Sequence, residues 1–333
     1  MRPVLPCLTL WLACSSAFAQ PSSAAPHPVS LLGPGATGPV VMDYLGYEPA
    51  TDTVWAPGGN TGKVFVLDAE SEQVQAVDGF PTREANGRQL GPSSVTFGPR
   101  TAYVGNRADG AVCAVDVSSR RRRECLKLEV PPDGLAYVAS SKEVWATQPR
   151  SNSIAVLAAT ESGLTARATV KVDGVPEGFA VDLQRARFYT NLQDKDETLA
   201  IDLATRQVAA RWKTGCGAKG PRGLALDAAR GLLFVACTDG FVGLLLDKGG
   251  AQLAGLVVGP GVDNPDIVPS MKRLLAAAGG AGTLSFVGYE DTGRLQLLRR
   301  LVTAPGVRVV VADKRGKAFA ADSAGGRIWI AGP

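Results

Sequence analysis

The chain repeats one alternation of apolar and polar positions over most of its length. From residue 38 onward, a small or apolar segment, a charged turn, an apolar run and a loop rich in Gly, Asn and Asp follow one another in a cycle. Short apolar runs of alternating polarity between such turns are typical of β-strands. The pattern therefore predicts an all-β chain built from units of short strands.

Three passages show the repeated unit most clearly. In each, a proline, a charged residue and a glycine precede an apolar pair, and a strand with an aromatic residue follows. A unit of this size cannot bury its apolar face alone and needs neighbouring copies. The passages are Pro132–Ala136 with Val144–Ala146, Pro176–Ala180 with Arg187–Tyr189, and Pro221–Ala225 with Leu233–Val235.

The residue after the proline-like position can be aligned through the whole chain, and we call these residues the anchors. Their separations are 50, 40, 44, 45, 41 and 45 residues. A period of this length with four short strands in each unit predicts the blades of a seven-bladed β-propeller. The anchors are Asp43, Ser93, Asp133, Glu177, Arg222, Asp263 and Arg308.

The two ends of the repeat predict how the ring closes. The last unit supplies only three strands, near residues 307–312, 317–321 and 326–330, while Val29–Leu32 precedes the first unit. We expect this N-terminal strand to complete the last blade, because that arrangement removes an exposed sheet edge.

The first residues have the pattern of a secretory signal. Arg2 is followed by an apolar stretch, Val4–Ala13, and by Ala17–Ala19, an A-x-A cleavage site. A lipoprotein signal through Cys14 is the alternative. No later segment keeps 18 apolar residues together, so we expect no further membrane span.

This signal sets the predicted domain boundaries and location. We expect a signal peptide over residues 1–19, a flexible tail over residues 20–28 and a single propeller domain over residues 29–333 of a monomeric periplasmic protein. The four cysteines after the signal then predict disulfides, Cys113–Cys125 and Cys216–Cys237, because their number is even and the compartment is oxidising.

Composition excludes few functions. With 45% apolar residues, 20% charged residues and a formal net charge of +4, the composition requires neither nucleic-acid binding nor membrane binding.

The run Arg120–Arg123 is predicted to be a solvated hairpin tip on the face opposite the anchors, with phosphate or nucleic-acid binding as the alternative. Two glycine-rich segments, Gly58–Lys63 and Ala277–Gly282, are expected to be turns between strands and not phosphate loops.

The passages Pro176–Lys195 and Gly220–Cys237, with Gly261–Asp263 and Val307–Arg308, resemble the YVTN-repeat (YncE-like) β-propeller family. The likeness covers most of residues 29–331 and is strongest from residue 130 to residue 240. The resemblance implies seven blades and export, with nucleic-acid or cell-surface binding in a few relatives. This chain lacks the histidines that some relatives carry in their first two blades.

The anchors are the candidate binding site, because the loops that lead into propeller blades converge at one end of the central channel. Four anchors are acidic, two are basic and one is serine. A Ca²⁺ ion held by Asp133, Glu177, Asn191 and Asp263 is one possibility, with Asn106 as a further donor. The alternative is a hydrated ring in which Arg222 and Arg308 neutralise part of the acid, or bind an anionic small molecule.

The sequence bears on two kinds of enzyme chemistry. The chain is similar in architecture to the SMP-30/gluconolactonase group, which would imply a metal-dependent lactonase or hydrolase at the same residues. The sole histidine, His27, falls in the predicted tail, which argues against a Ser-His-Asp triad or a histidine-based lyase. The leading prediction is a non-enzymatic module, without a resident cofactor, that binds a small polar ligand or a protein partner at the anchor face.

Overall fold

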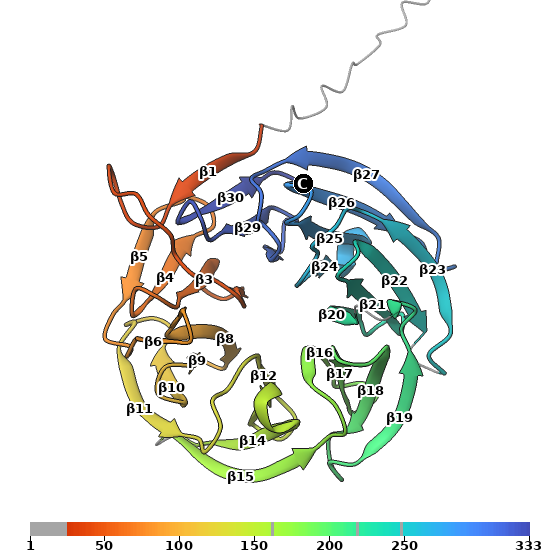
Figure 1. The fold of residues 1–333 in the computed structure, drawn as a ribbon, viewed down its shortest axis with the longest axis horizontal. Coiled ribbons are helices and arrows are strands. Elements are labelled where there is room, and N and C mark those ends of the chain that lie inside the picture. The colour runs from red at the N-terminus through yellow and green to blue at the C-terminus, as the bar shows by residue number, and fades with distance from the viewer. Residues whose placement is uncertain (1–24, 161–162, 218–219, 247–248) are drawn as a thin grey trace, which may run out of the picture.

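Seven four-stranded antiparallel sheets stand around a central axis in the described part of the chain, which gives a β-propeller (Figure 1). This computed structural model describes residues 25–333 apart from residues 161–162, 218–219 and 247–248. The predicted signal peptide and its cleavage site lie outside the described residues, as does Cys14. In the described ranges, no helix is both long enough and apolar enough to cross a membrane.

The strands of six sheets follow one another along the chain, the first being innermost. The first two sheets hold β2 (Gly46–Glu48), β3 (Thr53–Gly58), β4 (Lys63–Asp68) and β5 (Val74–Val77), then β8 (Pro92–Gly98), β9 (Thr101–Asn106), β10 (Ala111–Asp116) and β11 (Arg122–Lys127). The third and fourth hold β12 (Leu135–Val138), β13 (Glu143–Gln148), β14 (Ser153–Thr160) and β15 (Gly163–Lys171), then β16 (Pro176–Asp182), β17 (Arg187–Leu192), β18 (Glu197–Asp202) and β19 (Val208–Lys213). The next two hold β20 (Pro221–Asp227), β21 (Leu232–Cys237), β22 (Phe241–Leu246) and β23 (Gln252–Val257), then β24 (Asp266–Val268), β25 (Arg273–Ala278), β26 (Thr283–Tyr289) and β27 (Leu295–Val302).

The remaining sheet joins the two ends of the described chain. Its order is β1-β30-β29-β28, with β28 (Val310–Ala312) innermost, then β29 (Ala318–Asp322), β30 (Arg327–Ala331) and, outermost, β1 (His27–Ser30). The N-terminal strand therefore completes the sheet of the last three strands by pairing with β30. Its predicted bounds, Val29–Leu32, are wrong: the pairing starts at His27 opposite Ile330 and ends at Ser30 opposite Arg327.

The sequence predicted that His27 lies in a flexible tail, but the residue belongs to strand β1. Its ring Nε2 lies 2.7 Å from Oε2 of Glu72 in the turn between β4 and β5. Both His27 and Pro28 belong to β1, because they continue the backbone ladder along β30. The flexible-tail prediction over residues 20–28 is therefore wrong for these last two positions.

A small eighth sheet interrupts the repeat. It is the hairpin of β6 (Arg83–Ala85) and β7 (Arg88–Leu90), inserted between β5 and β8. Its turn residues Asn86 and Gly87 have φ values of 52° and 68°, as a two-residue hairpin turn requires. The regular repeat did not predict this hairpin, which accounts for the longest anchor separation, between Asp43 and Ser93.

The apolar core is divided between neighbouring sheets. Each cluster of buried side chains takes residues from two adjacent sheets, so the contact between blades is the main apolar interface. Trp55 and Trp145, both fully buried on second strands, contact Phe97 and Phe188 of the following sheets at centroid distances of 5.8 Å and 5.0 Å. Burial of such large aromatic side chains is a major stabilising contribution.

Aspartates close the hairpins into the outer strands at Asp68, Asp116 and Asp202. Each carboxylate accepts hydrogen bonds from backbone N–H groups two and three residues later. This is the Asx-type turn that a short acidic side chain favours. The equivalent Asp247 lies outside the described residues.

Both predicted disulfides are present. Cys113 of β10 bonds to Cys125 of β11, and Cys216 bonds to Cys237 at the end of β21. Cys125 is exposed, whereas Cys216 and Cys237 are buried.

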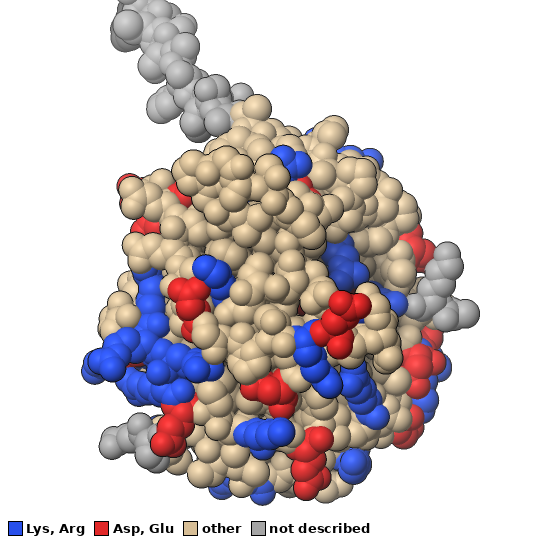
Figure 2. Space-filling model, turned by 60° about the vertical axis from the view of Figure 1, so that its left-hand side comes forward, with Lys and Arg blue, Asp and Glu red and all other residues tan. Residues whose placement is uncertain are grey.

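The basic run Arg120–Arg123 lies only partly in a turn. Strand alternation places the β10–β11 connection opposite the segments that lead into the blades, but Arg122 and Arg123 belong to β11 itself. Arg123 pairs with Asp116 at 2.8 Å, and the Arg122 guanidinium lies over the Phe80 ring. Figure 2 brings this side of the ring forward and shows acidic and basic side chains mixed, with one gathering of Lys and Arg at its left.

The two glycine-rich segments are turns between strands. One connects β3 to β4 and the other connects β25 to β26. Neither opens a helix, so neither has the setting of a phosphate loop.

Candidate functional site

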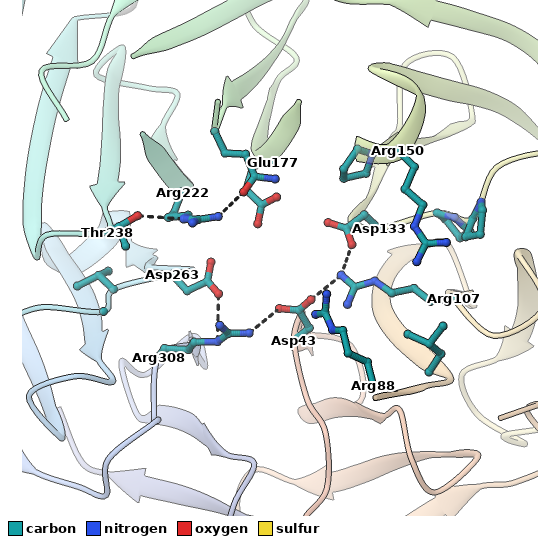
Figure 3. Close-up of a pocket in the computed structure, with 17 residues that line it drawn as sticks. Asp43, Arg88, Arg107, Asp133, Arg150, Glu177, Arg222, Thr238, Asp263 and Arg308 are labelled. Atoms are coloured by element: carbon teal, nitrogen blue, oxygen red, sulfur yellow. Dashed lines mark hydrogen bonds and ion pairs between the residues drawn. The ribbon is translucent and has the colours of Figure 1, made fainter. Parts of the chain in front are cut away.

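A cavity of about 440 Å³ opens where the segments that lead into the innermost strands meet (Figure 3). Six of the seven anchors line it: Asp43, Asp133, Glu177, Arg222, Asp263 and Arg308. The seventh, Ser93, does not. Its short side chain is buried, its hydroxyl lacks a hydrogen-bond partner, and only its carbonyl contributes, by accepting a bond from the Tyr44 N–H.

Direct contacts between neighbouring lead-in segments hold the anchors together. The N–H of Gly223 donates to the Asp263 carbonyl at 2.8 Å, and the N–H of Asp263 donates to the Arg308 carbonyl at 3.2 Å. A β-carbon on Gly178 would lie 2.3 Å from the Arg222 carbonyl oxygen, and one on Gly223 would lie 2.4 Å from that of Asp263. The glycine after each of these anchors is therefore required, because it lets adjacent blades approach at the channel mouth.

Arg107 is the most connected cation in the cavity. Its guanidinium donates to Asp133 and, at 2.5 Å, to Asp43. Burial lowers the pKa of Arg107, but the attraction of the two carboxylates outweighs it and the net shift is upward. Sequence reasoning missed this residue, because it follows the second strand β9 and has no equivalent in the repeated motif.

Both basic anchors, Arg222 and Arg308, also have partners. Nε of Arg308 lies 3.2 Å from Asp263, and a terminal nitrogen lies 3.7 Å from Asp43. Arg222 donates from Nε to the Thr238 hydroxyl at 3.0 Å and from a terminal nitrogen to the Gln193 side chain. The predicted neutralisation of acid by arginine is therefore seen directly only for Arg308.

Glu177 stands apart, because its carboxyl group makes no hydrogen bond or ion pair to any described residue. Burial is the largest cause that raises its pKa, to about 8, and repulsion from Asp133, Asp263 and Asp43 adds to it. The attraction of Arg222 lowers the pKa but does not offset these effects. At neutral pH the group is therefore mostly protonated. Burial and Asp43 likewise raise the pKa of Asp263 to about 6.

Tyr44 forms part of the support beneath the carboxylates. Its hydroxyl donates to Asp133 at 3.4 Å, and its ring stacks on Phe179 at a centroid distance of 5.8 Å. Burial, with the surrounding carboxylates, raises the pKa of Tyr44 well above its ordinary value. Tyr44 therefore remains a neutral hydrogen-bond donor.

Two further arginines at the cavity were not identified from the sequence. Arg88 comes from β7 of the inserted hairpin, and Arg150 comes from η1 (Pro149–Ser151), between β13 and β14. Both are exposed, and neither side chain has an ion pair or hydrogen bond to a described residue. No sequence signal was available for either, because both lie in segments that only one blade carries.

The predicted metal site does not fit the structure. Asn191 is fully buried and its side chain is used for structure: it donates to the Arg222 carbonyl at 2.7 Å and accepts from Thr198. Asn106 likewise bonds backbone groups at Pro81 and Ala108. Over the described ranges, no three side chains of His, Cys, Asp or Glu are grouped so that they could hold a metal ion. Arg107 and Arg308 instead pair with the aspartates Asp43, Asp133 and Asp263.

The comparisons with known proteins support the fold and no closer relationship. No protein-family model matches the chain, and no curated protein matches it. The resemblance to YVTN-repeat proteins therefore stays a prediction.

Solved structures are similar over nearly the whole chain. A chain of the "Crystal Structure of Mitotic Checkpoint Complex" has a TM-score of 0.76 at 15% identity, covering 100% of this chain and 99% of that one. The Cps50 (Swd1) β-propeller domain of Myceliophteria thermophila has a TM-score of 0.70 at 14% identity, covering 89% and 98%. A chain of Kuenenia stuttgartiensis hydrazine synthase has a TM-score of 0.68 at 16% identity, covering 86% and 93%. At these identities the likeness shows a β-propeller fold and does not carry a function over.

Proposed function

We propose that this protein is a non-enzymatic binding module that holds a small polar ligand in the cavity at the channel mouth. The cavity volume of about 440 Å³ lies within the range of small-molecule sites. Its lining is more strongly charged than that of a typical drug-sized pocket, which favours a polar ligand over an apolar one.

The main support is that three ionisable side chains lining the cavity have no hydrogen-bond or ion-pair partner among the described residues: Glu177, Arg88 and Arg150. By contrast, Arg107 and Arg308 are held by carboxylates. A ligand that binds the unpartnered groups gains charge-assisted hydrogen bonds without breaking an existing ion pair. These three side chains are therefore the proposed ligand contacts.

We also propose that the protein is exported. The predicted signal at residues 1–19 supports this, and so do the two disulfides, because such bonds persist mainly outside the cytoplasm. Fractionation of cells that make the full chain should recover it from the periplasm, with its N-terminus starting at Gln20. A protein that stays in the cytoplasm with Met1 intact would contradict the proposal.

The other predicted functions gain no support from the geometry. A lactonase of the gluconolactonase type needs a metal site, and Asn191 is not free to serve one. Nucleic-acid binding through Arg120–Arg123 would compete with the existing Arg123–Asp116 pair.

Equilibrium dialysis against a mixture of small polar metabolites, followed by mass spectrometry, tests the binding function. The wild-type protein should retain at least one compound, and the double variant Arg88→Ala/Arg150→Ala should retain much less of it. The control variant Arg121→Ala/Arg300→Ala removes the same charge from exposed arginines that do not line the cavity. Equal loss in both variants, or no retention by the wild type, would contradict the proposal.

A further inference from the structure

The two kinds of unpartnered group in the cavity have opposite chemical needs. Glu177 lies in the field of Asp133, Asp263 and Asp43, and the cation that acts on it, Arg222, already donates to Thr238 and Gln193. A carboxyl group in that setting is stabilised by a proton or by a bound cation. The ligand group beside Glu177 should therefore carry positive charge.

Arg88 and Arg150 need the reverse. Both are exposed at the cavity without a carboxylate partner among the described residues, and Figure 3 shows them on the side where Arg107 lies, across from Arg222 and Asp263. Guanidinium groups are the preferred partners of carboxylates and other planar anions in proteins. The ligand group on this side should therefore carry negative charge.

We propose, resting on the binding function above, that the ligand is a small zwitterion whose ammonium group lies beside Glu177 and whose carboxylate is held by Arg88 and Arg150. An α- or ω-amino acid or a short peptide belongs to this class. A dianion would place its second acid against the anchor carboxylates, and a diamine would place its second ammonium against the arginines. The mixed charge of the lining thus selects for a ligand with both signs.

Binding of such a ligand has a measurable consequence at Glu177. The free carboxyl group is mostly protonated at neutral pH, because its pKa is about 8. An ammonium group beside it favours the carboxylate, so the proton leaves to solvent while the ligand keeps its own proton. Up to about one proton should be released for each ligand bound at pH 7.

Isothermal titration calorimetry with matched ligands tests this inference. The probes are 4-aminobutyrate and 6-aminohexanoate, with succinate and adipate as diacids and 1,4-diaminobutane and 1,6-diaminohexane as diamines of the same lengths. An amino acid of the series should bind at least about tenfold more tightly than the matched diacid and diamine. Its measured binding enthalpy should differ between phosphate and Tris buffers, because the buffer takes up the released proton and the two buffers have different ionisation enthalpies. The size of the difference gives the number of protons released.

Variants separate the two ends of the ligand. Glu177→Gln should remove the buffer dependence and weaken binding of the amino acid, whereas Arg88→Ala/Arg150→Ala should weaken binding and keep the proton release. Arg121→Ala/Arg300→Ala should match the wild type in both respects. Tighter binding of a diacid or diamine, binding without proton release, or no binding across the series overturns the zwitterion, whereas the metabolite dialysis decides separately whether the cavity binds small molecules at all.

Discussion

One guanidinium nitrogen of Arg107 joins two anchors, because it lies 2.5 Å from Oδ2 of Asp43 and also donates to Asp133. The two carboxylates come from the first and third lead-in segments, while Arg107 follows β9 of the second sheet. A single side chain therefore spans three consecutive blades at the channel mouth.

Replacing Arg107 with methionine should destabilise the protein strongly, because two largely buried carboxylates would lose their shared cation. The expected loss in the free energy of unfolding at pH 7 is about 3 kcal/mol, the lower end of the range for breaking a buried ion pair. The lower end applies because the Arg107 side chain is 21% exposed. Urea denaturation measures it. Arg308→Met is the control, since Arg308 is 52% exposed and its loss should cost about 1 kcal/mol or less.

The pH dependence of the Arg107→Met defect follows from the direction of the carboxyl pKa shift. Burial already raises the pKa of Asp133 in the folded protein, and removal of Arg107 should raise it further. A raised folded pKa gives stability that is present at low pH and lost as the pH rises. The defect should therefore be smaller at pH 4.5 than at pH 7, and an unchanged defect would contradict the ion-pair explanation.

Glu177→Gln should stabilise the protein at high pH. The folded pKa of Glu177 is about 8, above its unfolded value, so the wild type loses stability as the pH rises from about 4.5 through 8. Glutamine keeps the shape and cannot ionise. The variant should match the wild type near pH 5 and exceed it at pH 9 by as much as about 4 kcal/mol, measured by denaturant unfolding at both pH values. The exposed Glu124→Gln is the control, and an advantage for Glu177→Gln at pH 5 alone would be the wrong sign.

The repeat made the anchors predictable because each is set by local chemistry. A proline, a charged residue and a glycine recur where an innermost strand starts, and the close approach at Gly178 and Gly223 explains why the glycine is needed. One aligned position per blade therefore converges on the channel mouth. The exception, Ser93, occupies the same place in the chain, but its side chain is too short to line the cavity.

The remaining site residues were not predictable, because they depend on contacts that only one blade makes. Arg88 lies on a hairpin that interrupts the repeat, and Arg150 lies in a short 3-10 turn. Asn191 was wrongly predicted to be a metal ligand, because its side-chain amide lies near the acidic anchors in the repeat. In the structure it donates a hydrogen bond to the Arg222 carbonyl and so connects adjacent blades. A pattern gives the position of a side chain along a strand and not its partner across the ring.

Removing β1 should weaken closure of the ring. A chain that begins at Leu31 loses the backbone ladder that pairs His27–Ser30 with β30, together with the His27–Glu72 contact. The melting temperature should fall and self-association should rise, because β30 becomes an exposed edge. Calorimetry and light scattering measure these effects against a control chain that begins at Ala25. His27→Ala alone should change the free energy of unfolding by less than about 1 kcal/mol, since the side chain is half-exposed. Equal melting temperatures for the two truncated chains would show that β1 does not stabilise the ring.

The two disulfides should differ in how readily they are reduced. Cys125 is exposed on the outer strand β11, so a thiol can reach the Cys113–Cys125 bond in the folded protein, whereas Cys216 and Cys237 are 5% and 0% exposed. Graded dithiothreitol, alkylation and peptide mass spectrometry should find Cys113 and Cys125 alkylated first. The buried Cys216–Cys237 bond should be reduced only as the protein unfolds. Each disulfide should raise the free energy of unfolding by about 3 kcal/mol, because it restricts the unfolded chain; the sequence separations are 12 and 21 residues. Cys113→Ala/Cys125→Ala and Cys216→Ala/Cys237→Ala, compared by urea denaturation, measure the two contributions. Reduction of Cys216–Cys237 before Cys113–Cys125 would mean that the loop before β20 opens more readily than its burial indicates.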